Sequence, residues 1–68
     1  MDIKFTYEEK KPNEHQVELI GTATFEFQGK QQKAVMAMMS LTEGYDRQAL
    51  EKQIKESLQK QIDKLTSI

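Results

Sequence analysis

The sequence predicts an α+β fold, in which a three-stranded antiparallel meander is followed by one C-terminal helix packed across one sheet face. Two observations lead to this prediction. Apolar residues alternate with polar ones in two segments before residue 28, a third segment before residue 41 is largely apolar, and after residue 46 apolar residues recur every three to four residues. An amphipathic helix must bury its apolar stripe, and a small meander offers it a single apolar face. A chain of 68 residues has room for one such domain, spanning 1–68.

The first two strands are expected on either side of a polar loop. Alternation over 3–8 predicts the first strand, and its apolar residues share one face. The stretch 9–16 is polar and contains Pro12, so we expect a loop there. Alternation resumes over 17–27, which predicts a long second strand. Gly21 in its middle indicates either a bulge or a bend over a large neighbouring residue.

The third strand is predicted over 32–40, after a two-residue turn that begins at Gly29. This turn would place Phe25 opposite Ala34, a large side chain against a small one. Unlike the other two strands, this segment carries apolar side chains on both of its faces. One of those faces therefore has no helix to cover it.

The helix is predicted over 46–66, because no glycine or proline interrupts the chain after residue 46. Asp46 is the expected N-cap, with Tyr45 before it and Leu50 after it placed as a hydrophobic staple. The apolar stripe of this helix consists of Leu50, Ile54, Leu58, Ile62 and Leu65. The sheet face beneath it should carry Ile3, Phe5, Tyr7, Leu19, Phe25, Phe27, Met36 and Met38.

Composition narrows the class of protein. Ten basic residues balance eleven acidic ones, which gives no reason to expect a polyanion or an anionic membrane as partner. The absence of cysteine excludes disulfides and thiolate metal sites and favours a reducing compartment. No apolar run is long enough to span a bilayer. We therefore expect a soluble, cytoplasmic protein with no membrane partner.

The sequence contains few candidate catalytic residues. The one histidine, His15, stands in a charged segment next to Pro12 and is best interpreted as a solvated loop residue. Carboxylates fall on outward positions, where burial would not tune them, and Asp46 is better explained as a helix cap. Neither metal-ligand spacing nor a glycine-rich phosphate loop is present. The prediction is a protein that is not an enzyme, with no catalytic residues, metal or cofactor.

The third strand supplies the functional hypothesis. If Met36 and Met38 join the core, an interface remains on the opposite face, and the residues predicted to form it are Ile20, Val35, Ala37 and Met39. The same strand lies at an edge of the meander, where unpaired backbone groups invite another strand. We expect a small binding or regulatory protein that forms a homodimer, or binds another protein, through this strand and face. The competing interpretation is that the loop 9–16 covers part of this surface.

Weak nucleic-acid binding is the alternative function, because a small sheet with exposed aromatic residues can stack bases while lysines hold phosphates. Two patterns argue against it. The aromatic residues share the parity that faces the helix, and the lysines of the helix are interleaved with acidic residues. Nucleic acid is therefore a less favoured partner than protein.

Overall fold

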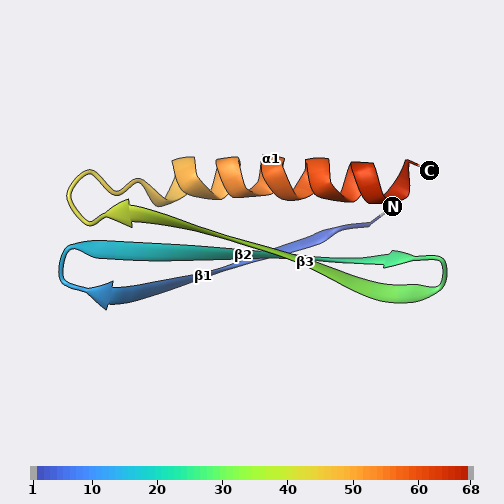
Figure 1. The fold of residues 1–68 in the computed structure, drawn as a ribbon, viewed down its shortest axis with the longest axis horizontal. Coiled ribbons are helices and arrows are strands. Elements are labelled where there is room, and N and C mark those ends of the chain that lie inside the picture. The colour runs from blue at the N-terminus through green and yellow to red at the C-terminus, as the bar shows by residue number, and fades with distance from the viewer. Residues whose placement is uncertain (1, 68) are drawn as a thin grey trace.

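The computed structural model describes residues 2–67, which form three strands and one helix in the predicted order (Figure 1). The elements are β1 (Lys4–Asn13), β2 (Gln16–Phe27), β3 (Lys30–Leu41) and α1 (Arg47–Thr66). The strands form one open antiparallel sheet with β2 in the middle. The helix runs along the sheet and makes its main contacts with β2 and β3 (Figure 1). The predicted β-β-β-α fold class is confirmed.

The first hairpin is longer than the sequence predicts. β1 continues to Asn13, so the expected loop over 9–16 is wrong, and only Glu14 and His15 separate the two strands. The turn is closed by the Asn13 side chain, whose Oδ1 accepts a hydrogen bond of 2.9 Å from the His15 amide. Pro12 is tolerated because β1 is an edge strand and its register with β2 shifts between Lys10 and Asn13.

The second hairpin corrects the predicted register. Its two-residue turn consists of Gln28 and Gly29, both with positive φ (55° and 75°), as a type I′ turn requires. β3 therefore begins at Lys30, two residues earlier than predicted, and Phe25 lies opposite Gln32 instead of Ala34. Because the shift is two residues, every side chain stays on its predicted face.

The core lies between the sheet and the helix. Its buried residues are Val17, Leu19, Ala23, Phe25, Ile54, Leu58 and Ile62. All eight residues predicted for the covered face belong to this cluster or pack against it. At Gly21 the predicted bend over a large neighbour is the correct alternative, since Ile54 Cγ2 occupies the space that a Cβ would need. The pairing of β2 is regular on both sides of this residue.

The start of α1 is fixed by side chains from two elements. Asp46 caps the helix as predicted, and its side chain accepts a hydrogen bond of 3.3 Å from the Ala49 amide. Tyr45 donates its hydroxyl to Glu9 of β1 at 2.8 Å, and Arg47 donates from Nε to Glu51 at 2.7 Å. Arg47 also forms an ion pair with Glu9 at 3.8 Å, so Glu9 is the residue through which the start of α1 is joined to the edge strand β1.

The molecule is long and thin, measuring 43 × 16 × 15 Å (Figure 1). Its radius of gyration is 13.5 Å, whereas a compact chain of this length has about 11 Å. The accessible surface is 5123 Å², compared with about 4,400 Å² for a compact monomer of this mass. One helix on a long sheet therefore leaves an unusually large surface exposed for the size of the chain.

Candidate interaction surface

The sheet face turned away from α1 carries an apolar strip along β3. The strip is formed by Ile20, Val35, Ala37, Met39 and Leu41, and this set is called the apolar strip below. Val35, Met39 and Leu41 are 58%, 50% and 62% exposed. Ile20 is half-buried and lies opposite Ala37 in the β2–β3 register. Three large apolar side chains that share an exposed surface on a small sheet are typical of an interaction site.

All four residues predicted for the interface lie on this one face. Leu41 was not predicted to belong to this surface, because the third strand was predicted to end at Ser40, whereas β3 ends at Leu41. The signal was nevertheless present. Leu41 has the same odd-numbered parity as Val35, Ala37 and Met39, and a strand one residue longer places it beside them.

The competing interpretation of this surface is wrong. It required the segment 9–16 to fold over Val35 and Met39, but most of that segment belongs to β1 and β2. β1 lies on the far side of β2 from β3, so it cannot cover these side chains. Both residues stay at least half exposed.

The backbone of β3 adds an open edge to the apolar strip. In a two-residue hairpin the residues flanking the turn, here Phe27 and Lys30, exchange hydrogen bonds, and bonded pairs then alternate along the ladder. The Thr42 amide donates to the His15 carbonyl at 2.9 Å, in agreement with this alternation. Even-numbered residues of β3 thus bond to β2, whereas odd-numbered ones direct their N–H and C=O groups outward.

This edge has few of the features by which proteins block edge strands. From 34 to 41 the strand contains no proline and no charged residue, and its pairing with β2 has no bulge. The nearest charges stand at the two ends of the edge, Lys33 at one end and Glu43 just beyond the other, and both are exposed. The exposed apolar side chains and the outward backbone groups belong to the same residues, so one partner could engage both.

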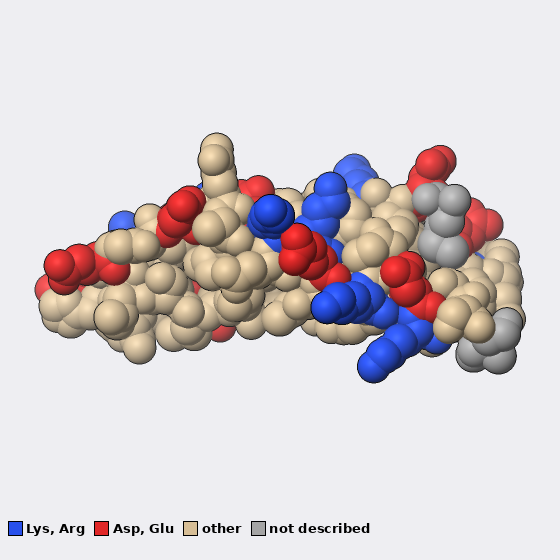
Figure 2. Space-filling view, turned by 90° about the horizontal axis from the view of Figure 1, so that it is seen from above, with Lys and Arg blue, Asp and Glu red and all other residues tan. Residues whose placement is uncertain are grey.

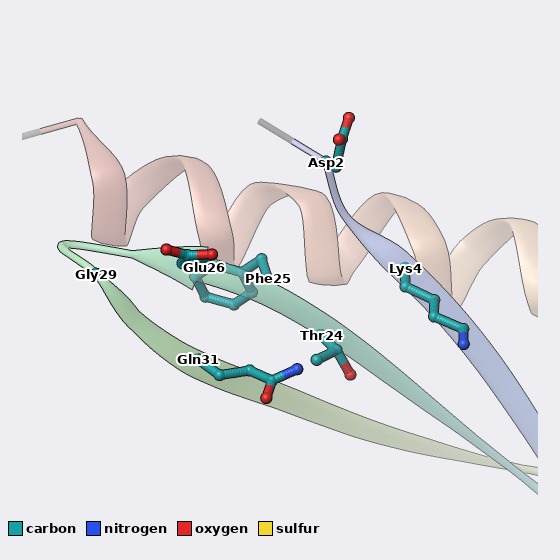
Figure 3. A pocket seen from close by; sticks show the side chains of 7 residues that line it. All are labelled: Asp2, Lys4, Thr24, Phe25, Glu26, Gly29 and Gln31. Carbon is teal, nitrogen blue, oxygen red and sulfur yellow. The ribbon is translucent and has the colours of Figure 1, made fainter.

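A hollow of the surface lies at the end of the sheet where the β2–β3 turn meets the start of the chain. This hollow, shown in Figure 3, has a volume of about 480 Å³ and is lined by Asp2, Lys4, Thr24, Phe25, Glu26, Gly29 and Gln31. Its charged side chains are Asp2 just before β1, Lys4 of β1 and Glu26 of β2, and no ion pair joins them. Within residues 2–67 no three His, Asp or Glu side chains are close enough together to hold a metal ion. His15 is exposed in the β1–β2 turn.

Three groups in the described chain have a shifted pKa, and all lie near the start of α1. The pKa of Tyr7 is raised by burial and by the nearby charge of Glu51. The pKa of Tyr45 is raised by burial and by its hydrogen bond to Glu9. The pKa of Arg47 is raised by its hydrogen bond to Glu51. Each shift favours the form already present at neutral pH, so none prepares an acid or a base for proton transfer there.

The aromatic residues of the strands do not form a base-stacking surface on the open face of the sheet. Phe5, Tyr7, Phe25 and Phe27 pack around the core beneath the helix, as the sequence predicts, and so they do not form a stacking platform on the open face. On the helix side, lysines and acidic residues are interspersed (Figure 2). Lys55 lies 5.2 Å from the centre of the Phe5 ring, where it packs within the same molecule.

Comparisons of the chain with protein-family models, with curated proteins and with solved structures give no match. In the part of the chain that the structure describes, no helix has the length and apolarity needed to cross a membrane. The apolar strip and the open edge of β3 are therefore the features of the molecule that bear on its function.

Proposed function

We propose that this protein acts by binding another protein chain through β3 and the apolar strip, and that the partner is a second copy of itself. The observation that carries the proposal is the coincidence of two features in the same residues. Val35 and Met39 expose half or more of their surface, and they belong to the set that directs backbone hydrogen-bonding groups to the open edge. A homodimer would cover the exposed apolar side chains and pair the free backbone groups of the edge without any other protein.

The size of the molecule supports this proposal. Its surface exceeds that of a compact monomer of the same mass by about 700 Å², close to the roughly 800 Å² that each partner buries in a standard protein interface. Among the described residues the core has seven buried apolar side chains, so added burial matters for stability. No interface of this kind requires a catalytic group or a cofactor.

Sedimentation velocity on the purified chain and on two variants tests the proposal. Val35→Lys and Met39→Lys each place a charge in the middle of the apolar strip without touching the core. The expected result is a dimer for the unchanged chain and a folded monomer for each variant, with the helical circular-dichroism signal retained. Burying one unpaired lysine costs several kcal/mol, which is enough to dissociate a dimer of micromolar affinity.

Thr6→Lys is the matched control, since Thr6 is an exposed residue of β1 on the same sheet face but at the opposite edge. This variant should remain dimeric. The proposal fails if the unchanged chain sediments as a monomer at every concentration tested, or if Val35→Lys and Thr6→Lys lower the association equally.

A further inference from the structure

We infer that two copies join edge to edge through antiparallel β3 strands, with the two-fold axis passing beside Met38. This inference rests on the proposed function and specifies how the partner is recognised. The two three-stranded sheets become one continuous sheet of six strands, and both helices lie on the same side. Lys33 of each copy pairs with the partner's Glu43, and these two residues set the register.

The hydrogen-bonding phase of β3 permits this arrangement. Val35, Ala37 and Met39 direct their backbone groups outward, so an antiparallel neighbour bonds through these residues and leaves the β2–β3 ladder intact. A two-fold axis perpendicular to the sheet keeps each side chain on its own face. The apolar strips of the two copies therefore meet and extend one another.

An axis at Met38 places apolar residues of one β3 strand opposite apolar residues of the other. Val35 lies opposite the partner's Leu41, and Ala37 lies opposite the partner's Met39, so every β3 residue of the apolar strip meets an apolar residue of the partner. Cross-strand pairs of this kind are the main source of side-chain stabilisation in a sheet. The same axis leaves Met38 opposite the partner's Met38 on the helix-covered side.

The charged residues favour this register over the two registers in which the axis is moved by one residue. With the axis at Met38, the exposed Lys33 comes beside the partner's turn that follows β3, in which Glu43 is exposed, so an opposite-charge pair can form at each end of the paired segment. Moving the axis by one residue in either direction sets a charge against an apolar side chain. An axis at Ala37 sets Lys33 opposite the partner's Leu41, and an axis at Met39 brings the turn that holds the partner's Glu43 beside Val35.

A groove at the edge receives the partner's loop in this register. The groove has a volume of about 290 Å³ and lies between the start of β3 and the C-terminal part of α1, where Ala34, Gln61 and Leu65 are among its lining residues. Leu65 is 46% exposed beside it. Because Lys33 faces the partner's Glu43, the partner's segment 42–45 runs alongside this opening.

Single-cysteine variants test the position of the axis, since the natural chain contains no cysteine. Under the inferred register Met38 faces its own symmetry mate in a non-hydrogen-bonded pair, with Cα atoms about 4.5 Å apart, which suits a disulfide. Met38→Cys should form a cross-linked dimer on mild oxidation. Met36→Cys and Ala37→Cys, which face other residues of the partner, should cross-link at least about tenfold more slowly.

Reversing the charges at positions 33 and 43 tests the ion pair between Lys33 and the partner's Glu43. Lys33→Glu and Glu43→Lys should each weaken dimerisation by about fivefold or more, since each removes two ion pairs and creates two like-charge pairs. The double variant should return to within about twofold of the natural affinity. Lys30→Glu is the control, because Lys30 lies outside the paired segment and should have little effect.

The outcomes separate this inference from the proposed function. A chain that stays monomeric overturns both. A dimer that Val35→Lys dissociates, but in which Ala37→Cys or Met36→Cys cross-links fastest, keeps the proposed function and overturns the register. A dimer that forms no cross-link at 36, 37 or 38 has no two-fold axis at any of these residues, which likewise overturns the inferred register. Fast cross-linking at 38 together with charge rescue supports the inference.

Discussion

Gly21 decides how closely the helix approaches the sheet. It lies at the middle of the central strand, opposite Tyr7 on one side and Met36 on the other. The side chain of Ile54 fills the position that a Cβ would take, and Leu58 and Tyr7 lie 3.5 Å from that position. The missing side chain therefore allows a buried isoleucine of α1 to contact the backbone of β2 directly. Glycine is suited to this position because it has no side chain, not because of its backbone flexibility.

Gly21→Ala should destabilise the protein by about 1–3 kcal/mol, because the added methyl group forces Ile54 or the helix to move. The double variant Gly21→Ala/Ile54→Ala should cost less than the sum of the two single changes, since the smaller side chain at 54 gives room for the methyl group. Urea denaturation of the four proteins measures this coupling.

Gly29→Ala is the control for the coupling measured between positions 21 and 54. Gly29 has open space around it but a φ of 75°, so alanine there costs free energy through the backbone. Its effect should add to that of Ile54→Ala without coupling. Equal coupling for both glycines would show that close packing is not what Gly21 provides.

Among the secondary-structure elements, the β2–β3 turn does not have the sequence that its turn type favours most. A type I′ turn needs positive φ at both central residues and favours Asn-Gly, whereas this chain has Gln28 with a φ of 55° before Gly29. Asparagine tolerates this conformation better than glutamine because its short side chain bonds to the local backbone. The turn therefore carries backbone strain that a single substitution can relieve.

Gln28→Asn should raise the free energy of unfolding by about 0.5–1 kcal/mol. The matched control is Gln31→Asn, which makes the same chemical change one residue inside β3, where asparagine is unfavourable. Denaturation of both variants by urea compares them. A stabilisation that is the same at 28 and at 31 would mean that turn geometry is not its cause.

The turn also shows why the elements were easier to predict than their pairing. Alternation is a local property, so the faces of Phe25 and Met36 could be predicted from the sequence. The register could not, because turns at Gln28–Gly29 and at Gly29–Lys30 leave the same residues facing the helix and differ only in which pairs meet. The extension of β1 past residue 8 was missed because both faces of the strand are exposed there, which removes the alternation on which the prediction depends.

For the whole molecule, the candidate surface follows from an imbalance that the sequence already contains. One helix supplies one apolar stripe, whereas β3 is apolar on both faces, so the residues Val35, Ala37 and Met39 could be predicted to lie uncovered. Their exposure and their shared edge with Leu41 depend on sheet order and strand length, which needed the structure. The balance of Lys33 and Glu43 at the two ends of that edge becomes meaningful only once the antiparallel register of a second copy is considered.

If the chain is a dimer, its thermal stability must depend on its concentration, because association favours only the folded state. Each tenfold rise in concentration should raise the melting temperature by about 3–5 °C, which follows from mass action and the unfolding entropy of a domain this small. Val35→Lys should melt at a temperature that does not change with concentration, while Thr6→Lys should keep the dependence of the natural chain. Calorimetry on reversible transitions measures all three. A concentration-independent melting temperature for the natural chain, over a range that spans its dissociation constant, would place the stability of this long sheet within a single copy and leave the exposed apolar strip without a role in folding.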